Sequence, residues 1–190
     1  MKTYLFMISH PAHFHLFRNT IDTLKAHGNE VIVVIRPKDV LEQLCMNSGM
    51  EYVKIKERSR TTGKVGMALS LIQKTGAVLK IVRRTRPDFL IGCDGAIAYA
   101  GELSGIPSFD CDEDDAEATP LFAKLFYPFF TGIIAPTICS AGNGNTRRQG
   151  ITPIMSWPTS IRIISPRTVA IWKNMASRKT GRFTWSGSPS

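Results

Sequence analysis

Short apolar runs alternate with longer amphipathic stretches over the first 140 residues of the chain. Each run has three to five residues, is rich in branched or aromatic side chains, and is bounded by glycine, proline or charged residues. The runs are residues 4–8, 31–35, 52–55, 89–91, 106–109 and 132–135. Runs of this kind are typical of strands that are buried on both faces of a parallel sheet.

Between the runs, apolar residues recur at three- and four-residue spacing, as they do in helices that bury one face. Residues 14–27 show this most clearly, and Gly28 follows them as a C-terminal cap. Further helices are expected over residues 38–48, 64–84, 95–104 and 119–130, the last interrupted at Pro128. The alternation predicts an α/β protein with a Rossmann-like, doubly wound, mainly parallel sheet and a ligand site at the carboxyl ends of its strands.

The excess positive charge of the chain lies after residue 140. The formal net charge is +9, from 24 Lys and Arg against 15 Asp and Glu. Residues 1–140 hold 16 of the basic and all 15 acidic residues, whereas residues 141–190 hold eight basic residues and all three tryptophans. This break predicts a Rossmann-like domain over residues 1–140 and an irregular basic tail over residues 141–190. Because the domain itself is nearly neutral, no specific nucleic-acid partner is expected.

Cysteine spacing and hydropathy limit the class further. The four cysteines form no C-x-x-C pair, so neither a zinc site nor a disulfide framework is indicated, and no metal or cofactor is expected. The apolar run after Lys2 meets His10 and Pro11 too early for a signal peptide. No apolar stretch is expected to reach the roughly 18 residues of a membrane span. We therefore expect a cytoplasmic protein that is soluble or peripheral to a membrane.

Three histidines follow the first predicted strand. A helix N-terminus directs backbone N–H groups towards anions, so His10 and His13 are candidates for binding substrate hydroxyls or phosphate. Simple loop or capping roles are the alternative. A metal site is a third interpretation, but a helix that begins near Phe14 would turn His15 away from His10.

Carboxylates follow the fourth and fifth predicted strands. Gly95 can let backbone approach a ligand beside Asp94, and Asp94 can instead cap the next helix. Six carboxylates lie within residues 110–117. Among them Asp112 and Glu113 are candidate general bases, because neighbouring carboxylates raise one another's pKa values. A solvated acidic loop and a divalent-cation site are the alternatives.

Two further patterns have ordinary structural explanations. The helix predicted over residues 64–84 ends in cations, which suit the negative end of a helix dipole: Lys80, Arg83, Arg84 and Arg86. The aromatic run within residues 122–130 is interpreted as core rather than as a membrane or lipid-acceptor surface.

Several of these stretches resemble the proteins catalogued as domain of unknown function 354, which look like GT-B glycosyltransferases and nucleotide-sugar 2-epimerases. The matching segments are residues 9–14 (SHPAHF), 27–31 (HGNEV), 86–88 (RPD) and 105–108 (GIPS), with the acidic loop after them. The resemblance implies two Rossmann-like domains that face a cleft, the N-terminal one holding an acceptor and the C-terminal one a nucleotide sugar. This chain has room for the first domain, since each half comprises about 150 residues.

The tail departs from this family pattern, and its residues suggest a shifted reading frame. Codons for residues 155–168, regrouped by one base, can encode HELAYFHPNHFTPD, which resembles the segment that the family carries after its sixth strand. The absence of acidic residues and the clustered tryptophans agree with a shift near residues 141–145. A tail of this origin has had no selection for packing.

The sequence thus predicts the acceptor-side domain of a GT-B-like nucleotide-sugar enzyme, truncated and inactive by itself. A nucleotide sugar and an acceptor are the expected partners of the full-length parent, with no defined protein partner. The substrate-binding candidates are His10, His13, Asp94 and Gly95, and the candidate bases are Asp112 and Glu113. The alternatives are a nonhydrolysing UDP-sugar 2-epimerase-like fragment, a stand-alone anion- or nucleotide-binding module, and a metal-dependent hydrolase that uses the histidine and acidic loops.

Overall fold

A computed structural model describes residues 1–37, 40–55, 63–111, 117–136 and 148–151 of the chain. The strands are β1 (Thr3–Ile8), β2 (Glu30–Ile35), β3 (Val53–Lys54), β4 (Phe89–Gly92), β5 (Ser108–Asp110), β6 (Gly132–Pro136) and β7 (Arg148–Ile151). The helices are α1 (Pro11–Ala26), α2 (Leu41–Asn47), α3 (Gly63–Thr85), α4 (Gly95–Ser104) and α5 (Pro120–Phe126), and a 3₁₀ turn follows over Tyr127–Phe129. The predicted α/β alternation is confirmed.

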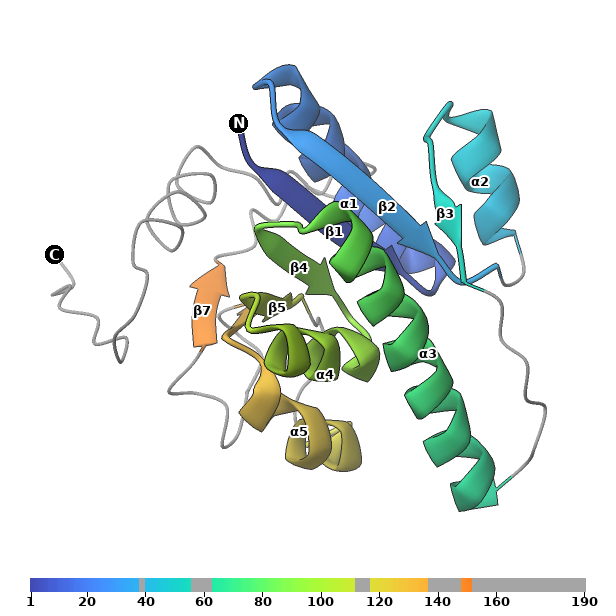
Figure 1. The fold of residues 1–190 in the computed structure, drawn as a ribbon, viewed down its shortest axis with the longest axis vertical. Helices are drawn as coiled ribbons and strands as arrows, with labels where there is room; N and C mark the ends of the chain where they lie inside the picture. Colours follow the sequence, from blue (N-terminus) through green and yellow to red (C-terminus); the bar gives the residue numbers. More distant parts are fainter. Residues whose placement is uncertain (38–39, 56–62, 112–116, 137–147, 152–190) are drawn as a thin grey trace, which may run out of the picture.

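All strand pairs are parallel, and the seven strands form one sheet in the order β3-β2-β1-β4-β5-β6-β7. The order reverses at β1, which pairs with β2 on one side and with β4 on the other (Figure 1). This doubly wound, Rossmann-like topology places its switch point between β1 and β4. The loops after these two strands are therefore the first place to look for a site.

Helices cover both faces of the sheet (Figure 1). Because side chains alternate along a strand, Phe6 and Ile8 of β1 face α1 and α2, whereas Leu5 and Met7 face α3 and α4. All four of these side chains are fully buried. Burying a large apolar side chain stabilises the fold by about 1.5–3 kcal/mol. Because both faces of the sheet bury such side chains, the strand sequences are continuous apolar runs.

The structure extends three details of the sequence analysis. Helix α1 begins at Pro11 rather than near Phe14, because proline suits the first turn and the His10 side chain caps the helix. Asp110 is the last residue of β5 and is fully buried, so it does not belong to the acidic loop. Strand β7 pairs with β6 within the stretch that was expected to be irregular, and the rest of that stretch lies outside the described residues.

The aromatic run at the end of α5 forms core, as expected, with one exception. Tyr127 and Phe130 are buried, and Phe122 and Phe126 pack against the same cluster from partly buried positions. Phe129 is 37% exposed. The helix ends before Pro128, where the chain tightens into the 3₁₀ turn.

Candidate functional site

The candidate site lies at the carboxyl ends of β1 and β4, on both sides of the switch point. Ser9 is the first residue after β1, and Asp94 lies two residues after the end of β4. The Ser9 hydroxyl donates a hydrogen bond to Oδ2 of Asp94 over 3.2 Å. Parallel pairing of β1 with β4 brings together two residues that are 85 positions apart in the sequence.

Asp94 is the centre of this cluster. Its backbone is extended, and its Oδ1 accepts the N–H of Ala96 at 3.0 Å, so it caps the N-terminus of α4. The capping role that the sequence suggested for Asp94 is therefore present. The carboxylate is also nearly buried, at 9% residue exposure. A buried charge of this kind needs a counterion, because desolvation opposes its charged form.

Lys74 of α3 supplies that counterion. Its Nζ lies 2.9 Å from Oδ2 and 3.1 Å from Oδ1 of Asp94, and the two side chains are 15% and 10% exposed. Sequence analysis did not identify Lys74. A signal was available, since Lys74 falls between Leu71 and Val78 on the helix side that packs against the core. A lysine in such a position needs a nearby carboxylate.

The two candidate histidines take different positions at the start of α1. His10 is the N-cap, and its Nδ1 accepts the N–H of Ala12 at 3.2 Å, which is the capping alternative. The rings of His10 and His13 are 6.0 Å apart between centroids. His13 is partly buried, and its Nδ1 has no hydrogen-bond partner among the described residues. Burial and the nearby His10 lower the pKa of His13, while Asp94 opposes this shift.

Gly95 packs closely against α5. A Cβ atom at this position would lie 2.3–2.5 Å from ring carbons of Phe126 in α5. The aromatic ring therefore occupies the room that a side chain would need. Nothing in the described residues tests a direct contact between Gly95 and substrate.

The candidate bases Asp112 and Glu113 lie outside the described residues, so their distance from the histidines stays a prediction. Cys93 and Cys111 mark the same edge of the sheet, and the Cys93 thiol donates to the backbone carbonyl of Cys111 at 2.9 Å. The metal-site interpretation of the histidines is a separate question. Within the described part of the chain, no group of three or more His, Cys, Asp or Glu side chains is placed to hold a metal ion.

The arrangement presents a compact polar cluster of an ammonium, a carboxylate and a hydroxyl, and the His13 imidazole lies near enough for Asp94 to influence its pKa. The Asp94 carboxylate already accepts from Lys74, Ser9 and Ala96, so it acts mainly as the holder of the other groups. The cluster can therefore bind hydroxyls or an anion at the switch point.

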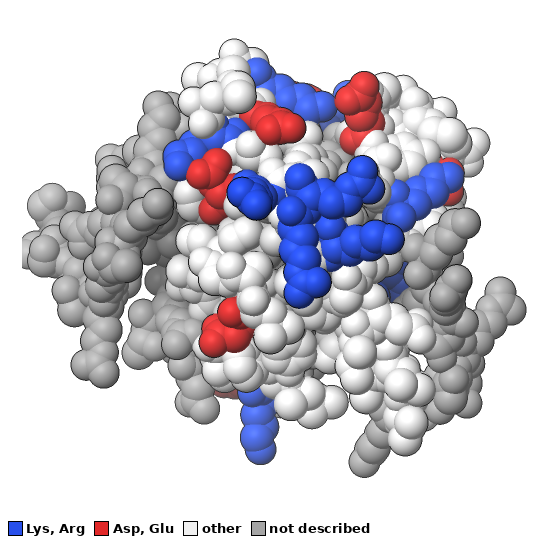
Figure 2. Space-filling view, viewed as in Figure 1, with Lys and Arg blue, Asp and Glu red and all other residues white. Residues whose placement is uncertain are grey.

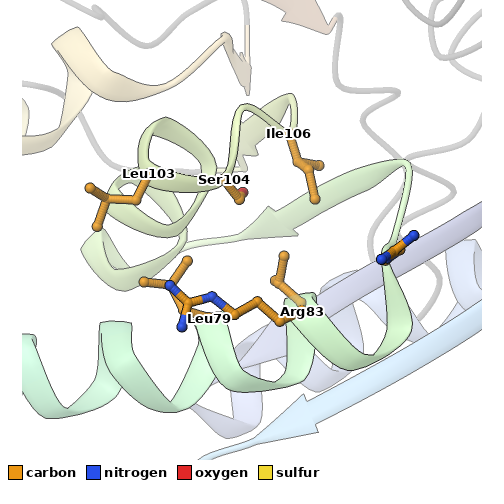
Figure 3. Close-up of a pocket in the computed structure, with 7 residues that line it drawn as sticks. Leu79, Arg83, Leu103, Ser104 and Ile106 are labelled. Atoms are coloured by element: carbon orange, nitrogen blue, oxygen red, sulfur yellow. The ribbon is translucent and has the colours of Figure 1, made fainter.

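A pocket of about 440 Å³ lies elsewhere, between the C-terminal ends of α3 and α4, at the opposite edge of the sheet (Figure 3). The topology of the sheet favours the carboxyl edge for substrate.

No protein-family model and no curated protein matches this sequence. Solved structures resemble it in fold. UDP-GlcNAc 2-epimerase from Neisseria meningitidis, bound to UDP-GlcNAc, matches with a TM-score of 0.63 and 12% identity over 91% of this chain and 50% of that chain. MurG from Acinetobacter baumannii matches with a TM-score of 0.59 and 15% identity over 82% and 46%.

The spinosyn rhamnosyltransferase SpnG, complexed with thymidine diphosphate, has a TM-score of 0.54 and 17% identity, over 72% of this chain and 45% of that chain. The chain thus spans about half the length of these structures. At such identities the likeness establishes the fold. The domain has a Rossmann-like fold, which the matched parts of these structures share.

Proposed function

We propose that this chain is the acceptor-side half of a GT-B-like nucleotide-sugar enzyme, and that it binds sugar hydroxyls or phosphate at the switch point. The observation that carries the proposal is the ion pair of Lys74 and Asp94 beside Ser9, at the carboxyl ends of β1 and β4. The fold supports it, because ligands of open parallel sheets bind at this edge. The named ligands of two neighbours, UDP-GlcNAc and thymidine diphosphate, support a nucleotide-sugar partner for the parent protein.

The roles proposed for individual residues follow from their contacts. Lys74 offers a charged donor and Ser9 a hydroxyl whose lone pairs remain available. His13 accepts or donates as a neutral imidazole, because its pKa is lowered by burial. Asp112 and Glu113 remain the proposed bases of the parent enzyme.

The remaining parts of the hypothesis rest on the sequence. Membership of the domain of unknown function 354 family, a cytoplasmic location and inactivity of this half by itself are part of the proposal. So is a shifted frame from about residue 141, which sequencing of the gene across codons 135–195 tests directly. A single-base discrepancy that restores a long open frame supports the shift. A confirmed short frame with no long open frame downstream in the shifted register contradicts it.

Ligand binding can be mapped on the chain with ¹H–¹⁵N NMR. We expect UDP-GlcNAc, free N-acetylglucosamine or inorganic phosphate to move the backbone amide signals of residues 9, 10, 12 and 13 and of residues 93–96. Lys74→Met should weaken the effect of phosphate at least fivefold, because the ammonium no longer contributes a charge-assisted hydrogen bond.

The matched control is Lys80→Met, which removes an exposed lysine from the same helix and should leave binding unchanged. Signals that move only near the pocket at the opposite edge would contradict the proposed site. Equal binding by wild type and Lys74→Met would exclude the role given to Lys74. The same titration separates a phosphate site from a sugar site, since each ligand is added alone.

A further inference from the structure

Helix α3 has an exposed apolar stripe that the proposed function does not use. The stripe recurs at four- and three-residue spacing along one side of the helix, over Val65, Leu69, Ile72 and Gly76, and it ends at Leu79, which is partly buried against the core. Val65, Leu69 and Ile72 are 70%, 43% and 66% exposed. Contrary to the sequence expectation, residues 65–85 are long and apolar enough to cross a membrane, and 22% of this window is buried.

The opposite side of α3 packs against the folded domain. Val78 and Val82 are buried in the core against the sheet, and Lys74 is paired with Asp94. These contacts hold α3 within the Rossmann-like domain. The exposed stripe therefore faces outwards from a folded domain, as in helices that lie in the plane of a membrane surface.

Cations gather where the stripe ends. Lys80, Arg83, Arg84 and Arg86 are all exposed, and among the described residues none of them has an acidic partner within ion-pair distance. Figure 2 shows basic side chains clustered over the C-terminal part of α3, above a largely uncharged area formed by α3, α4 and α5. An apolar surface edged by cations complements an apolar layer edged by anions.

The 440 Å³ pocket lies at this boundary between apolar and cationic surface. Leu79 and Arg83 of α3 face Leu103, Ser104 and Ile106 from α4 and the residues after it (Figure 3). Leu103 is 70% exposed and extends the apolar surface beyond α3. Arg86 completes the lining, so two guanidinium groups border an apolar hollow.

We infer that this face, the α3 surface, docks on a membrane that contains anionic lipid, with the stripe in the interfacial layer and the arginines at the headgroups. Charge favours a bilayer over a second copy of the chain. Helix α3 contains five basic and no acidic residues. A second copy paired along this stripe would offer no acidic residue from its own α3 to these cations, whereas anionic headgroups would neutralise them. The inference is independent of the proposed function, because it uses the outer side of α3.

Vesicle co-sedimentation of the full chain tests the inference. We expect binding to phosphatidylglycerol–phosphatidylcholine vesicles in 0.1 M NaCl and much weaker binding to phosphatidylcholine alone. The double variant Arg83→Gln, Arg84→Gln should bind at least tenfold more weakly, given about fivefold for each cation near an anionic surface. The matched control on the other face of the sheet is Arg18→Gln, Lys25→Gln, which should bind as wild type.

The apolar part of the surface needs its own pair of variants. Leu69→Ser with Ile72→Ser should lower vesicle binding, whereas Val40→Ser with Met46→Ser, two exposed apolar residues near or in α2, should not. All variants keep the basic residues 141–190, so the differences report the α3 surface. Arg86→Gly removes another cation of the α3 surface and should also lower vesicle binding. It should not unfold the chain, since Arg86 has a φ of 45° that glycine adopts more easily.

Two outcomes would overturn the inference. Equal losses in the α3 variants and in their controls would mean that general charge, including that of the tail, causes binding. The second outcome concerns Leu69→Ser with Ile72→Ser. If this variant has a lower mass than wild type in sedimentation equilibrium but binds vesicles equally well, the stripe forms a contact between copies of the chain.

Discussion

The Nζ atom of Lys74 lies within 3.1 Å of both carboxylate oxygens of Asp94, so one ammonium joins α3 to the N-terminal cap of α4. The pair is nearly buried and stands beside Ser9 at the switch point of the sheet. It therefore couples the packing of two helices to the geometry of the candidate site. Its removal should affect both stability and ligand binding.

Asp94→Asn tests the electrostatic part of this relationship. Asparagine is also a good N-cap, so the variant keeps the cap and leaves Lys74 as an unpaired, nearly buried cation. We expect a loss of about 3 kcal/mol in the free energy of unfolding, measured by urea denaturation. Lys74→Met combined with Asp94→Asn should be at least about 1 kcal/mol more stable than the sum of the single effects predicts. Strict additivity would show that the two charges do not interact.

Gly95→Ala should destabilise the protein because the added methyl group overlaps the ring of Phe126. We expect a loss of about 1–3 kcal/mol, typical of overpacking. Gly76→Ala is the matched control in α3, where nothing lies within 4 Å of the added Cβ. It should stabilise the protein by about 0.5–1 kcal/mol, because alanine is the better helix former. The midpoint temperatures of thermal unfolding should therefore fall for Gly95→Ala and rise for Gly76→Ala.

Because of His13, the free energy of unfolding should fall as the pH decreases. Burial lowers the pKa of His13 in the folded protein below its usual value of 6.5, so the unfolded chain binds a proton more readily. The contribution of neutral His13 is complete above pH 6.5 and is lost as the pH falls from 6.5 towards the folded pKa. His13→Gln should reduce this slope in urea denaturation between pH 7.5 and 5.5. An unchanged slope in His13→Gln would contradict the lowered pKa of His13.

Asp88 should contribute to stability above its pKa and lose that contribution in acid. Partial burial raises the pKa of Asp88, but hydrogen bonds from Lys2 and from the N–H of Thr3 outweigh it and lower the pKa overall. The contribution is present above the unfolded pKa of about 3.9 and disappears as the pH falls through the lower folded value. Asp88→Asn should flatten the acid side of the stability curve. An unchanged acid transition would contradict the shift.

Local sequence patterns were sufficient for the class of fold and for most of its elements. The apolar run of β1, the stripe of α1 and the interruption at Pro128 depend on residues a few positions apart, so their periodicity can be read directly. The cap at Asp94 could be predicted from the sequence in the same way, because it is a contact with Ala96, two residues later. The loops at the switch point followed from strand–helix alternation.

Tertiary structure decided which residues meet. Lys74 reaches Asp94 from another helix, and Gly95 leaves room for Phe126, which is 31 positions away in the sequence. The exposure of Val65, Leu69 and Ile72 also depends on how α3 lies on the sheet, because an apolar stripe alone predicts burial. The sequence by itself determined the periodicity, and so the elements and their order. Packing between distant segments determined the ion pair, the role of Gly95 and the exposed stripe, since these energies exist only once the layers are assembled.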